Sequence, residues 1–106
     1  HLKNQADSIM IHATIILTVK PEFESDVDEI AGLLTKAGQL SRQEPGCVRF
    51  DVFHSQSNAS VFLLSECWDS QETLDAHREA EAYTTIYVPK VRPRVERVPH
   101  VSTLLE

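Results

Sequence analysis

The segment Val61–Trp68 constrains the fold of this chain more than any other, because both of its faces are apolar. Successive side chains of a β-strand point to opposite sides of the sheet, so residues of one parity share a face. One face would carry Val61, Leu63, Ser65 and Cys67, and the other Phe62, Leu64, Glu66 and Trp68. A sheet that packs on one side only shows clean alternation of apolar and polar residues. The segment therefore predicts a sheet that is covered on both faces, whereas one layer of helices covers only one.

The first half of the chain alternates between strand and helix patterns. β-Branched residues are frequent over residues 9–19, which predicts a strand that Pro21 ends, because proline cannot continue a central ladder. Apolar residues recur every three or four positions over about residues 23–43, which is typical of an amphipathic helix. Two further strands are predicted over residues 47–55 and 60–68, with a hairpin turn between them.

The second half begins with a helix start signal. Asp69 as N-cap and Glu72 three residues later predict a capping box that opens a helix over about residues 70–79. A further helical stretch follows from residue 80, although Pro89 and Pro93 would break or kink it.

A last strand is predicted over residues 99–105, which completes the order β-α-β-β-α-(α)-β, with the further helical stretch in parentheses. This order is the split βαβ pattern of an α+β, ferredoxin-like fold with a four-stranded antiparallel sheet. At 106 residues the chain is expected to form one domain, residues 9–106, after a polar tail, residues 1–8. A domain of this size has a thin core, so a partner that covers the second face of the sheet would stabilise it.

Composition and charge exclude several classes of protein. The 10 basic and 16 acidic residues give a formal charge of −6, which argues against binding to nucleic acid or to anionic membranes. No apolar run approaches the ~20 residues that a membrane helix needs. The polar start lacks the apolar stretch of a signal peptide, so we expect a cytoplasmic protein. No metal site is expected. Cys47 and Cys67 do not occur in a metal-ligand motif, and the histidines are not spaced as paired ligands: His12, His54, His77 and His100.

Four short motifs occur in an order and at spacings that are distinctive together. They are Ala13-Thr14-Ile15 leading to Val19-Lys20-Pro21, then Glu44-Pro45-Gly46-Cys47-Val48-Arg49-Phe50, then Glu66-Cys67-Trp68-Asp69-Ser70, then Leu74-Asp75-Ala76-His77. In these motifs the chain resembles the antibiotic biosynthesis monooxygenase domain, a family of the dimeric α+β barrel superfamily. The resemblance implies a homodimer in which two four-stranded sheets face each other, with a small pocket between each sheet and its helices. Members of the family include cofactor-independent oxygenases, haem-degrading enzymes and isomerases of a phosphorylated signal, and the fold alone does not choose among them.

Trp68 and His77 form the centre of the predicted site. Trp68 ends a strand and His77 follows nine residues later on the next helix, so the two can meet at the mouth of one pocket. Trp68 would either stack against an aromatic ring or anchor the core. His77 would either move protons near neutral pH or lie exposed on its helix. Together with these two residues, the resemblance implies oxidation of a small aromatic or quinol substrate without a metal or other cofactor.

Further positions are predicted to bind the substrate: Phe62, Glu66, Tyr83, Thr14 and Ile15. Haem-degrading relatives carry an asparagine on the first strand near Thr14 or Ile15, and its absence here argues against haem breakdown. Glu66 would be a pocket acid or base if it is buried, or it would pair with a nearby arginine such as Arg49. Tyr83 and Tyr87, four residues apart, would either pack in the core or line the pocket.

A basic run near the C-terminus leaves a second function open. Lys90, Arg92, Arg94 and Arg97 lie within eight positions and would form either a solvated face or a clamp for phosphate or carboxylate at the mouth of the pocket. With such a clamp, the chain would isomerise or degrade a small phosphorylated carbonyl compound. The remaining alternative is a stress protein that binds a small ligand without catalysis and uses the barrel only to dimerise.

Overall fold

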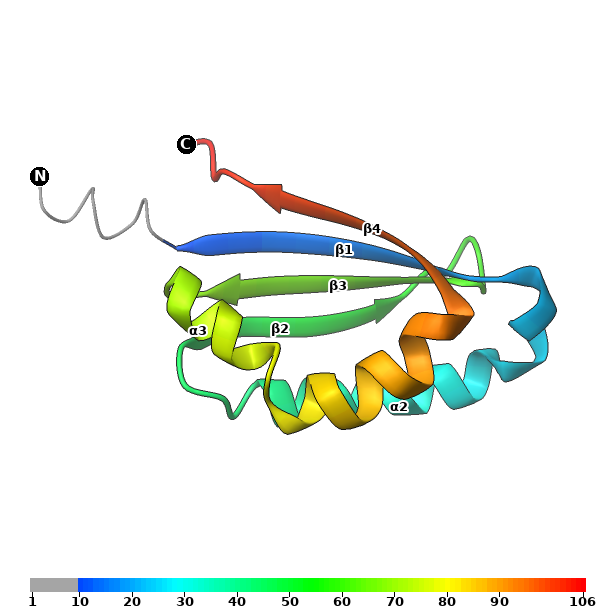
Figure 1. Ribbon diagram of the computed structural model, residues 1–106. Helices are drawn as coiled ribbons and strands as arrows, with labels where there is room; N and C mark the ends of the chain where they lie inside the picture. Colours follow the sequence, from blue (N-terminus) through cyan, green and yellow to red (C-terminus); the bar gives the residue numbers. More distant parts are fainter. Residues whose placement is uncertain (1–9) are drawn as a thin grey trace, which may run out of the picture.

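A four-stranded antiparallel sheet forms one layer of the fold and helices form the other (Figure 1). The computed structural model describes residues 10–106, so the tail predicted for residues 1–8 lies outside the described residues. The strands are β1 (Ile11–Val19), β2 (Cys47–His54), β3 (Val61–Trp68) and β4 (Val95–Ser102), in the sheet order β2-β3-β1-β4. This topology confirms the predicted ferredoxin-like α+β fold.

The register of the sheet decides which polar residues face the helices. On β1 the buried, helix-facing residues alternate along the strand as Ala13, Ile15, Leu17 and Val19. Ala13 pairs with Glu66 of β3, and Leu17 pairs with Arg97 of β4. Residues directly opposite one another on neighbouring strands lie on the same face of a sheet. Glu66 and Arg97 therefore face the helix layer.

The first helical segment has two parts, where the periodicity predicted one helix. Pro21 opens a short 3-10 helix, η1 (Pro21–Asp26), which is kinked at the non-helical backbone of Phe23, and α2 (Val27–Ser41) follows after the non-helical Asp26. Proline suits a first turn, since its missing N–H has no partner there anyway. The apolar stripe of α2 packs on the sheet and is buried at Ile30 and Leu34.

The turn from α2 into β2 depends on Gly46, which has a φ of +82°. This left-handed conformation is costly for residues with a Cβ atom. A Cβ at this position would also overlap the side chain of Thr73 and lie 2.6 Å from Oδ1 of Asp69. Gly46 therefore lets the chain turn closely under the start of the next helix.

That helix, α3 (Gln71–His77), is capped by a different pair from the one predicted. Ser70 is the N-cap: its Oγ accepts a hydrogen bond from the Thr73 N–H at 3.2 Å, and Thr73 Oγ1 accepts one from the Ser70 N–H at 3.3 Å. Asp69 instead accepts a hydrogen bond from Thr73 Oγ1 at 2.9 Å. The predicted capping box of Asp69 with Glu72 is therefore wrong by one residue, because Asp69 and Ser70 are both good caps and only the turn geometry selects between them.

The second half of the helix layer is a π-helix, η2 (Ala82–Val91), followed by a 3-10 turn, η3 (Arg92–Arg94). β4 then begins at Val95, four residues before the predicted start at residue 99. The prediction was wrong because it took Pro99 for a strand boundary. β4 is an edge strand, and an edge strand tolerates proline, since the missing N–H can face away from the ladder.

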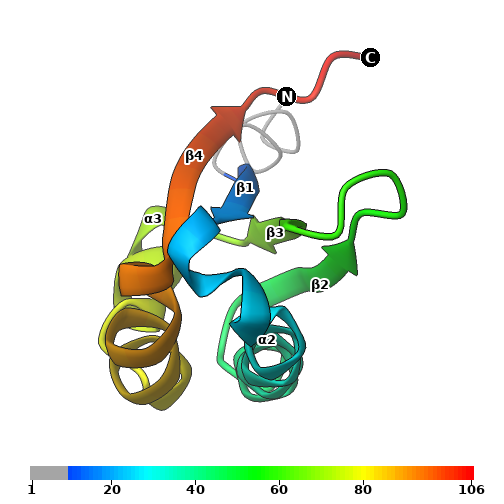
Figure 2. The same cartoon turned by 90° about the vertical axis from the view of Figure 1, so that its right-hand side faces the viewer.

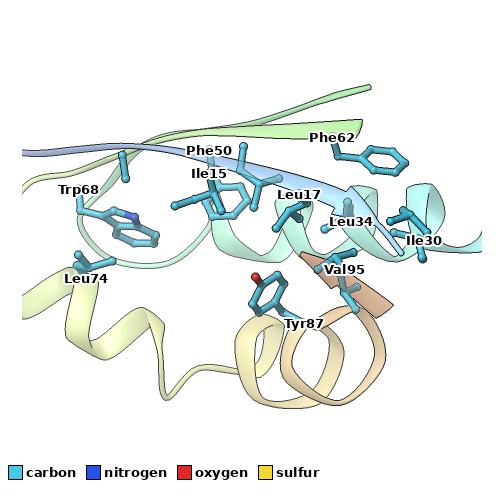
Figure 3. Packing of buried hydrophobic residues seen from close by; sticks show 14 residues of the cluster. Ile15, Leu17, Ile30, Leu34, Phe50, Phe62, Trp68, Leu74, Tyr87 and Val95 are labelled. Atoms are coloured by element: carbon cyan, nitrogen blue, oxygen red, sulfur yellow. The ribbon is translucent and has the colours of Figure 1, made fainter. Parts of the chain in front are cut away.

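The core lies between the helix layer and one face of the sheet (Figure 2). Leu17 and Phe62 of the sheet lie at the end of the core near Ile30 and Leu34 of α2, whereas Trp68 lies at the other end beside Leu74 (Figure 3). The side chains of β3 that face the helices, Phe62, Leu64, Glu66 and Trp68, are thus buried, as expected from the three large apolar residues among them.

The opposite face of the sheet is bare in the described chain. It carries Ile16, Leu63, Phe53 and Val98, of which Phe53 is 54% exposed and Val98 49% exposed. Exposed apolar patches of this kind mark contact surfaces. A second copy of the chain on this face stays a prediction, which sedimentation of the purified protein would test. Among residues 10–106, no helix is both long and apolar enough to cross a membrane.

Candidate functional site

A cavity of about 190 Å³ opens between the sheet and the helix layer. Its walls are mostly apolar and come from both layers, with Ile15, Leu34, Phe50, Leu64 and Leu74 among them. An apolar cavity of about 150 Å³ is large enough for benzene. The cavity therefore has the size and surface for a small aromatic molecule, and a few polar side chains enter it.

His77 is the central polar residue of the cavity, and Glu44 orients it. The imidazole Nδ1 lies 2.7 Å from Oε1 of Glu44, and the two side chains are only 8% and 15% exposed. An ionised carboxylate only accepts hydrogen bonds, so Nδ1 carries the proton that is shared with Glu44. The lone pair of the neutral ring is then on Nε2, which makes no hydrogen bond to residues 10–106. His77 is thus arranged as a proton acceptor inside the cavity.

Trp68 packs against the ring of His77. Its indole is fully buried and lies against the imidazole at a ring-centroid distance of 4.6 Å and an angle of 33°. Phe50 packs against both rings, edge to face with the indole at 6.5 Å and tilted against the imidazole at 5.6 Å. Trp68 is not part of the cavity lining, so it anchors the core and holds the His77 ring in place.

Glu66 is buried beside these rings and accepts a hydrogen bond from Trp68 Nε1 at 3.0 Å. Burial raises the pKa of the Glu66 carboxyl, and the Trp68 hydrogen bond and the nearby His77 oppose the rise. The predicted partner Arg49 does not pair with it: Arg49 lies opposite Cys67 on the other face and donates to Ser65 Oγ at 3.2 Å. The expected ion pair is therefore wrong, because the register separates the two side chains.

The raised pKa of Glu66 predicts a pH-dependent gain for Glu66→Gln. The folded state favours the neutral acid, so the stabilisation holds below the unfolded-state pKa and is lost as pH rises through the folded-state pKa. Glutamine stays neutral and its amide oxygen still accepts from Trp68. At about pH 8 the variant should be more stable by on the order of 1 kcal/mol, or about 4–8 °C in Tm, and near pH 4 the gain should vanish. Thermal unfolding measures this, with exposed Glu72→Gln as the control; a lower Tm at pH 8 would contradict it.

The structure brings together some of the predicted substrate-binding residues and not others. Ile15 and Tyr83 line the cavity with Glu66, and the ring of Tyr83 meets His77 edge to face at 5.6 Å. Thr14 is exposed on the opposite face of the sheet. Phe62 is buried outside the cavity lining and stacks on His54 at 4.2 Å. Thr14 and Phe62 are therefore not placed to contact a molecule in this cavity.

The basic run does not form one clamp. Arg94 pairs with Asp26 at 3.1 Å and with Glu29 at 3.0 Å, which ties the chain before β4 to the start of the helix layer. Lys90 and Arg92 are exposed outside the cavity. Arg97 is the member of the run that lines it.

Glu44 and the cavity residue Ser41 were not predicted as part of the site, and Arg97 was predicted only as one member of a four-residue clamp. Glu44 was interpreted only as part of a helix stop. The only available sign of a role for Glu44 was that it is an acidic residue in the Glu44-Pro45-Gly46 turn. Its contact with His77 spans 33 positions, so no local pattern could reveal it.

The thiols and metal ligands add no further chemistry to the described part of the chain. Cys47 and Cys67 are free, and burial raises the pKa of Cys47 from 9.0 to about 11, which disfavours its reactive thiolate. Within residues 10–106, no three His, Cys, Asp or Glu side chains gather where they could hold a metal ion.

Comparison with known proteins agrees with this architecture. The sequence profile of the family "antibiotic biosynthesis monooxygenase" matches residues 10–87. Protein sll1783 of Synechocystis is 29% identical over 76 residues, which cover 72% of this chain and 48% of that protein. The chain thus spans about half the length of this curated relative.

Solved structures share the fold at low sequence identity. The crystal structure of an antibiotic biosynthesis monooxygenase is 23% identical with a TM-score of 0.79, and the match covers 91% of this chain and 99% of that one. SnoaB, a cofactor-independent oxygenase from Streptomyces nogalater, is 10% identical with a TM-score of 0.76, over 92% and 94% of the two chains. The family profile covers most of the described fold, including Glu44, Trp68 and His77. The chain belongs to the antibiotic biosynthesis monooxygenase family.

Proposed function

We propose that this chain is a monooxygenase that oxidises a small aromatic or quinol substrate without a cofactor. The observation that carries the proposal is the buried pair of His77 and Glu44 at an apolar cavity, with a bond of 2.7 Å that leaves Nε2 as a base. The family supports oxygenation, and SnoaB, which shares the fold, is a cofactor-independent oxygenase.

The first step is the removal of a proton from the substrate. Nε2 of His77 accepts the hydroxyl proton of the bound quinol, and Glu44 stabilises the imidazolium that forms. The resulting anion is electron-rich, and the apolar walls keep water away from it. These are the conditions in which an aromatic anion can reduce dioxygen directly.

The oxidation balances without a further reductant. The anion transfers electrons to dioxygen, and one oxygen atom bonds to a ring carbon that loses its hydrogen. The second oxygen atom leaves as water after it takes up two protons, one of them returned by His77. The net reaction is quinol plus dioxygen to hydroxyquinone plus water: the ring loses four electrons and dioxygen gains four.

Oxygen uptake tests the proposal. The purified chain should consume one dioxygen per molecule of a quinol or anthrone, and mass spectrometry with isotopically labelled dioxygen should find one labelled atom in the product. A chain that binds the same molecules without oxygen uptake would be a binding protein, and the proposal would fail.

A further inference from the structure

Arg97 is a cationic side chain in the cavity without an anionic partner. It faces the helix layer from β4, opposite Leu17 of β1, and is half-buried. It forms no ion pair with a carboxylate of residues 10–106, whereas Arg94 three residues earlier forms two. An arginine in a small, mostly apolar cavity is expected to bind an anion.

Two hydroxyl groups in the cavity also lack partners. Ser41 Oγ and the Tyr87 hydroxyl are buried, and neither makes a hydrogen bond of good geometry within residues 10–106. Figure 3 shows the Tyr87 hydroxyl turned from η2 toward the sheet. Buried polar atoms without a partner are rare, because each costs the free energy of its lost hydration. Both residues line the same cavity, so a ligand there could supply the missing bonds.

Arg97 and Tyr87 both line this cavity. Burial raises the pKa of the Tyr87 hydroxyl, and the positive charge of Arg97 opposes the rise, in agreement with this placement. Glu44 is already paired with His77, and Glu66, the acidic residue that lines the cavity, senses the charge of Arg97 without forming an ion pair with it. Arg97 therefore has no ion-pair partner among the carboxylates of the described residues.

On these grounds we propose that the cavity selects quinols that carry a carboxylate, which Arg97 and the Tyr87 hydroxyl bind while a ring hydroxyl faces His77. A guanidinium fits a carboxylate through two parallel N–H bonds, and the tyrosine donates a third. The short reach across the cavity limits the substrate to a small ring system. The quinol ring in this proposal rests on the proposed function, whereas the carboxylate site does not depend on it.

Binding without turnover tests the inference. Calorimetric titration of the intact chain in the absence of dioxygen compares gentisate, a quinol with a carboxylate, with hydroquinone, which lacks it. Gentisate should bind at least tenfold more tightly. Arg97→Gln should weaken gentisate by about 10–100-fold and hydroquinone by less than about threefold, because charged hydrogen bonds are lost for gentisate alone. Lys90→Gln, which removes an exposed charge of the same basic run, should change neither affinity.

Tyr87→Phe is the second variant and keeps the inference testable if Arg97→Gln does not fold. It should weaken gentisate by about 3–10-fold and leave hydroquinone unchanged. Equal affinities for the two probes, or an equal loss of both in Arg97→Gln, would overturn the carboxylate site. Tighter binding of the phosphate ester of hydroquinone than of gentisate would overturn it in favour of a phosphorylated ligand. Because these titrations involve no oxidation, a failed oxygen assay would leave their result unaffected.

Discussion

His77→Ala should lower kcat/KM for oxygenation by about 100- to 10,000-fold, the usual range for the loss of a general base. Without the imidazole, no other side chain among the cavity residues is oriented by a carboxylate to take the hydroxyl proton. The substrate then stays protonated and reduces dioxygen poorly. Oxygen uptake over a range of substrate concentrations measures the loss, and thermal unfolding shows whether the variant still folds.

Two matched variants separate the chemistry from the packing. Glu44→Gln can still accept the Nδ1 hydrogen bond but loses the charge that stabilises the imidazolium, so kcat should fall by about tenfold or more. His54→Ala removes a histidine that stacks on Phe62 outside the cavity lining and should leave activity unchanged. If His77→Ala is folded and retains a third or more of the activity, His77 is not the base.

Trp68→Ala should destabilise the fold by about 3–5 kcal/mol, the range for a buried aromatic residue. The indole is fully buried and packs against both Phe50 and His77, so its removal leaves a void at the junction of β3 and α3. It also removes the N–H that Glu66 accepts. Small domains have about 5–15 kcal/mol in total, so the variant would be marginally folded.

Urea unfolding followed by circular dichroism measures this loss. Fluorescence would not serve, because Trp68 is the only tryptophan of the chain. Trp68→Phe keeps most of the ring packing and loses only the hydrogen bond to Glu66, so it should cost about 1–3 kcal/mol. A loss below 1 kcal/mol in Trp68→Ala would show that the indole does not anchor this end of the core.

The elements of the fold could be predicted wherever a local pattern sets the structure. The alternation over Val61–Trp68 predicted β3 and two faces in need of cover, of which the structure describes cover for one, and the three- and four-residue spacings predicted α2. The errors came where two local choices compete. Asp69 and Ser70 are equally good caps, and Pro99 marks a boundary in most strands but not in an edge strand.

The candidate site was less predictable, because its residues meet only after the layers pack. His77 and Glu66 were predicted as site residues, but their hydrogen-bond partners were not. His77 bonds to Glu44, although it was expected either to act on a substrate or to lie exposed on its helix. Glu66 accepts a hydrogen bond from Trp68, and not from the expected Arg49. The strand register explains why Arg49 does not bond to Glu66. Phe50 is the residue of β2 opposite Glu66, and Arg49, one position earlier, faces the other side of the sheet.

The sequence alone determined the order of strands and helices, the apolar character of both faces of β3 and the family resemblance, because each depends on neighbours within a few positions or on short motifs. The tertiary structure decided which side chains enter the cavity. Arg97 lines it and Arg94 does not, although the two are three residues apart in the same basic run. Such choices depend on strand register and on how the helix layer packs across the sheet, and these are set by contacts between residues far apart in the chain.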